Sequence, residues 1–383
     1  MKKIQIKSIK KLVPYAAGVS LSILALVCVL LRIISASPNY NEAMVFAARL
    51  SLPSGNTSMT EADEAASAED SEVSDSSTDK KQKSSEKPKK KAEQIPVNAE
   101  ISEPTEKELA EYDKSHEDEN KYTVYETNIT GAGEKYDNFY VKQNASEKID
   151  IEEELNGKLG FTPEKTDKPQ VLIVHTHTCE GYLKYDTGYY YESYYPRTNN
   201  NNENVCAVGE AITKALNKRG IKTLHDTTQH DNPSYNGAYD RSMETIQEYL
   251  EKYPSIKVVL DIHRDAFSTD EDGAMKKPTF TTADGQKAAQ IMIMAGCDVD
   301  DVRDYPEWRY NLRFALKLQQ TAETLYPGMT RPLNFGDFVY NMNANTGSLL
   351  IEVGTDGNSL NEVKLTGTLL GDAIAETLEN NYK

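Results

Sequence analysis

Cysteine and positive charge are both scarce in this sequence, and each shortage excludes a class of protein. Of the four cysteines, Cys28 lies in a long apolar run, and the other three are unsuited by number and spacing to a disulfide framework. The net charge of −17, from 60 acidic and 43 basic residues, excludes a nucleic-acid binder, because such proteins cluster Lys and Arg to neutralise phosphates. No repeat with a period of about 20 to 50 residues occurs, which excludes a solenoid.

Aromatic residues are missing between Phe46 and Tyr112, where Ser, Thr, Glu, Asp, Lys and Ala predominate. Such a composition cannot bury enough apolar surface to offset the entropy that is lost on ordering. Within this stretch an acidic block (Glu61 to Asp79) precedes a lysine-rich block (Lys80 to Lys91). We therefore expect residues 35–119 to form an extracytoplasmic stalk and disordered linker.

The N-terminal part of the sequence carries a membrane signal. Its first eleven residues contain five lysines and no acid, and the twenty residues from Leu12 to Leu31 are uncharged and mostly apolar. Twenty helical residues rising about 1.5 Å each match a hydrocarbon core of roughly 30 Å, whereas the apolar core of a secretory signal has only about 7 to 15 residues. We expect a cytoplasmic segment at 1–11, an uncleaved single-pass anchor at 12–34 in the cell membrane and an extracytoplasmic remainder, with cleavage after Ala36 as the alternative.

From residue 120 onward the pattern is that of a folded protein. Short alternating stretches predict a small β-rich lead-in module at 120–165, and residues 166–383 then alternate apolar runs with segments of helical periodicity. The expected strands lie at 171–174, 221–224, 257–263, 290–295 and 348–354, and the expected helices at about 205–216, 241–252, 312–325 and from 361. This order predicts an α/β domain with a mainly parallel sheet, helices on both faces and ligands bound beyond the carboxyl ends of the strands.

Three of these strand ends carry side chains that suit a metal centre. His177 and Glu180, three residues apart after the first buried strand, can reach one cation, and His263 closes another strand at an equivalent place. Two imidazoles and one carboxylate leave a zinc ion with an open position and a net positive charge, which lowers the pKa of bound water. We therefore predict one Zn²⁺ per chain at these three residues. Glu352 ends a third strand and is the expected general base and acid.

Neighbouring polar residues are expected to support this centre. His175 alternates with His177, so only one of the two rings should face the metal, and His175 is the alternative ligand. Arg264 and Asp265 follow His263 directly and either orient it, hold a substrate carboxylate or form an ordinary surface ion pair. The remaining candidates for substrate contact or support are His225, His230 and Asn358.

Several motifs between residues 120 and 383 occur together in one order. They are Val171 to Glu180 (VLIVHTHTCE), His225-Asp226 with His230-Asp231, Tyr235 to Tyr239 (YNGAY), Asp261 to Asp265 (DIHRD), Tyr326 to Gly328 (YPG) and Leu350 to Gly354 (LIEVG). In this combination the chain resembles the stage II sporulation protein P family of endospore-forming bacteria. It is also similar, more broadly, to zinc N-acetylmuramoyl-L-alanine amidases, which have an α/β fold, a His/Glu/His zinc site and a late Glu. Those amidases carry the zinc-binding Glu at the start of the helix after the first strand, so the resemblance makes Glu203 the alternative to Glu180.

The resemblance implies an activity, a location and partners. The implied activity is cleavage of peptidoglycan at the amide between the lactyl group of muramic acid and L-alanine, and a cross-link endopeptidase activity is also attributed to the family. The implied role is septal wall thinning and engulfment, from the mother-cell membrane facing the septal wall. Besides peptidoglycan, the implied partners are the lytic transglycosylase stage II sporulation protein D and the membrane protein stage II sporulation protein M.

Two other functions are compatible with parts of the sequence. His175 and His177 resemble the opening pair of a binuclear amidohydrolase barrel, but such a barrel needs about 250 residues and only roughly 210 follow the start of the first histidine-bearing strand. The seven tyrosines between Tyr182 and Tyr195 suit a rim that contacts glycan, so a non-catalytic wall-binding scaffold with a structural metal is the second alternative.

Overall fold

A computed structural model describes residues 100–382, and all of them belong to the second of two compact units, Ala66–Lys383. The predicted anchor at 12–34 and most of the predicted linker lie outside the described residues. Among residues 100–382, no helix has the length and apolar character that crossing a membrane requires.

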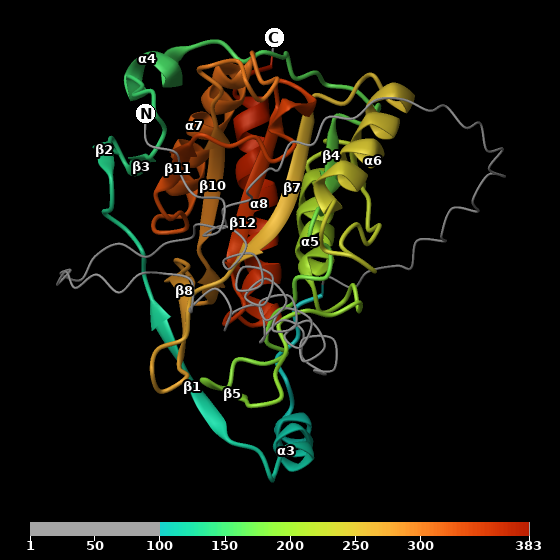
Figure 1. Cartoon of the computed structure of the whole chain (residues 1–383), viewed down its shortest axis with the longest axis vertical. Helices are drawn as coiled ribbons and strands as arrows, with labels where there is room; N and C mark the ends of the chain where they lie inside the picture. Colours follow the sequence, from blue (N-terminus) through green and yellow to red (C-terminus); the bar gives the residue numbers. More distant parts are fainter. Residues whose placement is uncertain (1–99, 383) are drawn as a thin grey trace, which may run out of the picture. The chain divides into compact units, whose positions relative to one another are not determined.

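An eight-stranded sheet forms the centre of this unit (Figure 1). Its strands, in spatial order, are β2 (Glu134–Tyr136), β3 (Phe139–Gln143), β11 (Leu333–Gly336), β10 (Ile291–Gly296), β12 (Ser348–Thr355), β7 (Val258–Asp265), β4 (Val171–Val174) and β6 (Thr223–His225). Strand β4 is apolar and buried throughout, and β7 is buried along nearly all of its length, as expected for strands covered on both faces. The sheet is open, with β2 and β6 at its edges, so the barrel expected of a binuclear amidohydrolase is absent from the described residues.

The prediction of a mainly parallel sheet is wrong, because the sheet is mixed. Strands β12, β7, β4 and β6 run parallel to one another, and β10, β11 and β3 form a second parallel group. The two groups run in opposite directions and meet where β10 pairs antiparallel with β12. The chain leaves the sheet after β7, forms β8 (Met275–Thr281) and β9 (Lys287–Ala289), and returns in the opposite direction as β10. Alternation of strands and helices in a sequence does not reveal such a reversal.

Helices cover both faces of the sheet. Helices α5 (Val205–Lys218), α7 (Trp308–Leu325) and α8 (Leu360–Glu379) pack their apolar side chains with Ile173, Leu260 and Ile351 in the main core. Helix α6 (Ala238–Lys252) places Ile246 on the opposite face, against Leu172 and other residues of a second apolar cluster. The prediction of helices on both faces is therefore confirmed.

A second, four-stranded sheet has the order β5 (Tyr189–Tyr191), β1 (Lys121–Thr127), β8 and β9. Helix α3 (Glu106–Ser115) is joined to it because the Tyr189 and Tyr191 hydroxyls both donate to Asp113, at 2.5 and 2.7 Å. This helix lies inside the predicted linker. It forms because Thr105 and Glu108 make a capping box and because it carries an aromatic anchor, Tyr112, that the preceding sequence lacks.

Residues 120–165 contain strands, as expected, but these are shared between the two sheets. Strand β1 pairs with β8 in the small sheet, whereas β2 and β3 form the edge of the large one. Helix α4 (Ile151–Asn156) is held to α7 by ion pairs from Arg309 and Arg313 to Glu154. The lead-in segment is thus packed into the same unit as the rest of the described chain.

Candidate metal centre and catalytic carboxylate

Strands β4, β7 and β12 run in one direction, so their carboxyl ends lie side by side at the same end of the strands (Figure 1). In the register between β7 and β12, His263 lies opposite Glu352. Because side chains alternate along a strand, Asp261 and His263 project from the same face. The strand pairing alone therefore brings a histidine and two carboxylates together.

The His263 ring lies between two carboxylates. Its Nε2 is 2.9 Å from Asp261 Oδ1, and its Nδ1 is 3.6 Å from Glu180 Oε2. Asp261 is fixed in turn by Thr176, whose backbone N–H donates at 2.8 Å and whose hydroxyl donates at 2.6 Å. Nε2 lies at ion-pair distance from Asp261 but has no hydrogen-bond partner among the described residues, whereas Nδ1 faces Glu180.

His177 completes the group from the turn after β4. Its ring stacks on Tyr235, with centroids 4.2 Å apart and an interplanar angle of 7°, and it meets the His263 ring edge-on at 5.3 Å. Within residues 100–382, the buried atoms His177 Nδ1 and Glu352 Oε2 have no hydrogen-bond partner. Buried polar atoms are normally paired, so these two are open to a ligand, although the ligand atoms of His177, Glu180 and His263 do not all lie within 4.8 Å of one another.

The electrostatics of His177 suit a metal, whereas His263 must first lose a proton to bind one. Burial, aided by the nearby His263, lowers the pKa of His177 to about 3, so its imidazole is neutral at pH 7 and its lone pair is free for a cation. Burial also raises the pKa of Glu352 to about 8 against the opposing effect of His263, and it raises that of Glu180. For His263 burial acts downward, but Asp261 and the other two carboxylates outweigh it and raise the pKa to about 10.

Arg264 and Asp265 have different roles in the structure. The Arg264 backbone N–H donates to Glu180 Oε2 at 3.1 Å, and its guanidinium donates to the carbonyls of Gly181 and Pro196 at 3.1 and 2.7 Å. Arg264 thus holds the loop that carries Glu180. Asp265 forms an ion pair with Arg331 at 2.8 Å.

Arg331 is a neighbour of the site that sequence reasoning missed. Arg331 is only 4% exposed, and its positive charge acts to lower the pKa of Glu352, in opposition to burial. No motif marks it, because it lies in the loop before β11 and reaches the site only through the fold.

The other predicted site residues make contacts of their own elsewhere in the fold. His230 uses both ring nitrogens, on the His175 carbonyl at 2.8 Å and on Thr245 Oγ1 at 2.9 Å. Asn358 closes the turn between β12 and α8, where its Oδ1 accepts from the Thr355 N–H at 2.9 Å. Glu203 is half-buried just before α5, and its backbone bonds to Asn200 and Tyr182, whereas Glu180 is the carboxylate beside His263.

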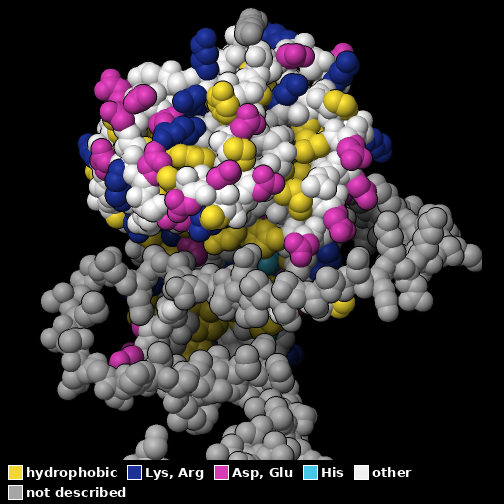
Figure 2. Space-filling model, turned by 45° about the horizontal axis from the view of Figure 1, so that its top comes forward, with side chains coloured by type: hydrophobic (Ala, Val, Ile, Leu, Met, Phe, Trp, Pro, Cys, Tyr) yellow, Lys and Arg dark blue, Asp and Glu magenta, His cyan; other side chains and the backbone are white. Residues whose placement is uncertain are grey.

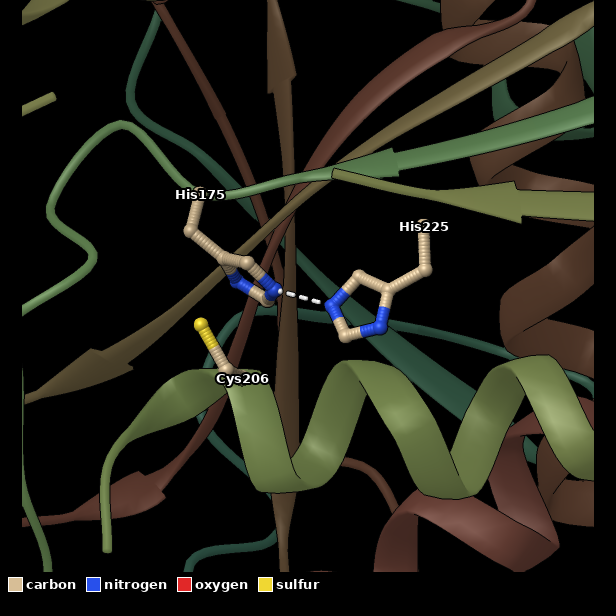
Figure 3. A group of neighbouring side chains, drawn as sticks. All are labelled: His175, Cys206 and His225. Atoms are coloured by element: carbon tan, nitrogen blue, oxygen red, sulfur yellow. Dashed lines mark hydrogen bonds between the residues drawn. The ribbon is translucent and has the colours of Figure 1, made fainter. Parts of the chain in front are cut away.

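His175 and His225 form a separate cluster with Cys206, shown in Figure 3. His175 lies at the end of β4 and His225 at the end of β6, while Cys206 lies in the first turn of α5. His175 and His177, although two residues apart, therefore belong to different groups.

The tyrosine-rich tract is largely structural. Tyr182 and Tyr194 donate to the carbonyls of Val353 and Asp356, at 3.0 and 2.8 Å, and Tyr190 and Tyr191 are buried. Tyr195 is 68% exposed and is the member that is free to meet a ligand. On the face seen in Figure 2, acidic and basic side chains of the described residues are interspersed, without a continuous basic patch.

Comparisons with known proteins relate most of the chain to one family. The family model described as stage II sporulation protein P (SpoIIP) matches residues 41–375. A stage II sporulation protein P from Bacillus subtilis (strain 168) is 27% identical over 221 residues, which is 55% of this chain and 51% of that protein. The match thus spans about half the length of that curated relative.

Solved amidase structures also match, at low TM-scores. The CwlD amidase from Clostridioides difficile, in complex with the GerS lipoprotein, has a TM-score of 0.35 and 12% identity, with 55% of this chain and 98% of that chain covered. The N-acetylmuramoyl-L-alanine amidase AmiC2 of Nostoc punctiforme has a TM-score of 0.33 and 12% identity, with 57% of this chain and 98% of that chain covered. At these scores the two structures support no inference about this chain.

Proposed function

Because the chain belongs to the stage II sporulation protein P family, we propose that it is a zinc-dependent peptidoglycan hydrolase that cleaves the amide between muramic acid and L-alanine. The observation that carries this proposal is the group formed by His177, Glu180, His263 and Glu352. Its four side chains come from three strand ends. Two of their buried atoms, His177 Nδ1 and Glu352 Oε2, have no hydrogen-bond partner among the described residues. Such a group suits hydrolysis better than structural metal binding, because structural zinc sites usually have four protein ligands.

His177, Glu180 and His263 are the residues that would hold the metal. Zn²⁺ bound there supplies a Lewis acid that polarises the amide carbonyl and lowers the pKa of a bound water. Asp261 keeps the His263 ring oriented through Nε2, and Arg264 keeps Glu180 in place through its backbone N–H. Glu352, opposite His263 in the register, takes a proton from the attacking water and delivers it to the leaving amine.

The substrate and setting belong to the proposal too. The expected substrate is septal peptidoglycan, with the amide bond to L-alanine as the main target and the peptide cross-link as a second. We place the protein in the mother-cell membrane through its N-terminal segment, with stage II sporulation proteins D and M as partners. Family membership supports these assignments, and each of them is open to experiment.

Digestion of defined muropeptides tests the reaction. The purified chain, incubated with and without Zn²⁺, should release stem peptides that begin with L-alanine, as identified by mass spectrometry. A chelator, His263→Ala and Glu352→Gln should each abolish release. Release that persists after chelation, or binding to sacculi without any release in the presence of zinc, would overturn the proposal, and the second result would indicate a wall-binding scaffold.

A matched pair of variants identifies the carboxylate ligand. Glu180→Gln should lose the ion held with His177 and His263, and activity with it, because Glu180 Oε2 faces His263 Nδ1 at 3.6 Å. Glu203→Gln, which changes the half-buried carboxylate before α5, should keep both. The opposite result in zinc content, measured by mass spectrometry of the metal, would assign the ligand to Glu203.

A further inference from the structure

Three potential metal ligands face one another on the α5 side of the sheet, outside the group that contains His177. Figure 3 shows the rings of His175 and His225 directed at each other above the first turn of α5, from which the Cys206 thiol points toward them. The two Nε2 atoms are 2.9 Å apart, and these atoms and Cys206 Sγ all lie within 4.8 Å of one another. His175 and Cys206 are fully buried, and the His225 side chain is 5% exposed.

The hydrogen bonds of the two rings determine where their protons lie. His175 Nδ1 is 2.9 Å from the Ile262 carbonyl oxygen, which can only accept, so this nitrogen carries a hydrogen. His225 Nδ1 is 3.2 Å from Glu210 Oε2, which accepts in the same way. In their neutral forms the two rings therefore direct bare Nε2 lone pairs at each other, an arrangement that requires a proton or a metal cation between them.

The helix leaves room for this arrangement at Gly209. A Cβ at this position would lie 2.6 Å from His225 Nε2 and 2.7 Å from His175 Nε2. Glycine is disfavoured inside a helix, yet any other residue here would collide with the two nitrogens. Gly209 and Cys206, three residues apart, thus present one face of α5 to the histidine pair.

We propose that His175, Cys206 and His225 form a second Zn²⁺ site, distinct from the one at His177, Glu180 and His263. Two imidazole nitrogens and one thiolate are a ligand set that Zn²⁺ prefers over Mg²⁺ or Ca²⁺. The Ile262 carbonyl and the Glu210 carboxylate hold the two rings from behind, as acceptors commonly do for zinc-binding histidines. On binding, the Cys206 thiol releases its proton to solvent and its sulfur bonds to the metal.

The two histidine rings need only a small movement for the ion to enter. A tetrahedral zinc with nitrogen ligands at about 2.0 to 2.1 Å places them roughly 3.3 Å apart, so the rings must separate by about 0.4 Å. Once bound, the ion fastens the ends of β4 and β6 to the first turn of α5. This connection lies two residues before His177 and so steadies the turn that leads to it.

Cobalt substitution distinguishes this site from the proposed catalytic one, because only this site offers a thiolate. Metal-free protein titrated with Co²⁺ should bind two ions per chain, and one of them should produce a thiolate-to-cobalt charge-transfer band in the near ultraviolet. Cys206→Ser should abolish the band and reduce the metal content from two ions to one. Cys297→Ser, which alters another buried cysteine, should leave both unchanged.

Two further variants separate this site from the other proposed metal centre and test the space between its ligands. His263→Ala should remove the other ion and retain the thiolate band, so failure of the proposed catalytic function leaves this test intact. Gly209→Ala should abolish the band without changing any ligand, and circular dichroism would verify that it folds. A band that is absent from the unaltered protein, or that survives Cys206→Ser, would overturn the proposal and leave a histidine pair that shares a proton.

Discussion

Asp261 places a fixed negative charge beside the ring of a neighbouring histidine. It accepts two hydrogen bonds from Thr176 and lies 2.9 Å from His263 Nε2, so its carboxylate is fixed before any cation binds. Burial acts against its ionisation, but His263 and the Thr176 donors prevail and lower the pKa of Asp261 to about 2. A permanently ionised Asp261 keeps His263 in one orientation.

Replacing Asp261 by Asn should therefore weaken zinc binding. The amide keeps the size of the side chain but removes the negative charge beside His263, and loss of such a partner typically costs about 10- to 100-fold in metal affinity. Competition with a chromogenic chelator measures the change. Asp298→Asn, at a buried carboxylate bonded to other backbone groups, is the control and should leave zinc affinity unaltered.

Asp298 itself should make stability depend on pH. Its oxygens accept from the backbone N–H groups of Val302, Arg303 and Tyr305 at 3.0, 2.8 and 3.1 Å. Burial alone would raise its pKa, but these donors outweigh burial and lower it. A pKa that is lower in the folded state gives stability that is present above the unfolded value, near 3.9, and is lost as the pH falls through the folded value.

Asp298→Asn should accordingly lower the thermal unfolding midpoint at pH 7, because one oxygen cannot serve all three donors. The difference from the unaltered protein should shrink as the pH drops below about 4, because the aspartate of the unfolded chain then binds a proton that the folded chain still excludes. Differential scanning calorimetry at several pH values tests this. A difference that stays constant down to pH 3 would contradict the assigned cause.

At the scale of single residues, strand ends were the informative signal. His263 and Glu352 could be predicted to lie near each other because each closes a clear apolar run, and the register places them side by side. Arg331 and Cys206 could not be predicted in this way. Their positions depend on how a loop and a helix pack on the sheet, and no local pattern encodes that packing.

Elements were predictable where their apolar pattern is unbroken. Strands β4, β7, β10 and β12 and helices α5 to α8 were expected close to their observed bounds. Strand β8 was missed because its sequence, MKKPTFT, contains Lys277, which is buried in the structure. Lys277 Nζ is 2.7 Å from Glu362 Oε1 and 2.7 Å from Asp186 Oδ1, so tertiary ion pairs replace the apolar side chain that the pattern requires.

Removing this lysine should destabilise the junction between β8 and α8. Lys277→Met leaves the buried Glu362 without its cation, and breaking a buried ion pair costs about 3 to 5 kcal/mol. Lys287→Met on the adjacent β9 is the matched control, because its pair with Glu126 is about half exposed and such pairs contribute about 0 to 1 kcal/mol. Urea unfolding gives the free energy of unfolding of each variant. Equal losses in the two variants would show that the buried ion pair contributes no more stability than the exposed one.

For the whole described unit, the two opposed groups of strands explain why residues at the expected strand ends lie together although the direction of the sheet was predicted wrongly. The predicted site residues come from β4, β7 and β12, which all belong to one parallel group. The reversal affects only β10, β11 and β3, whose carboxyl ends lie at the other edge. An incorrect sheet topology therefore did not disturb the argument about strand ends.

Metal binding should stabilise the folded chain as a whole. A ligand that binds only the folded state adds about 2.7 kcal/mol at a free concentration 100 times its Kd. Removing zinc by chelation should therefore lower the melting temperature by several degrees. Added zinc should raise the melting temperature of Glu352→Gln by the full amount and that of His263→Ala by less. An equal rise in both variants would contradict the assignment of His263 as a ligand.

The place of β12 in the sheet has a consequence for biosynthesis. This strand is made after all the other described strands, yet it lies in the middle of the large sheet, between β10 and β7. A nascent chain that has not yet delivered residues 348–355 has neither a continuous sheet nor Glu352. We therefore expect a chain that stops before this strand to lack the proposed hydrolytic activity, because the proposed site is complete only after the central strand has been inserted.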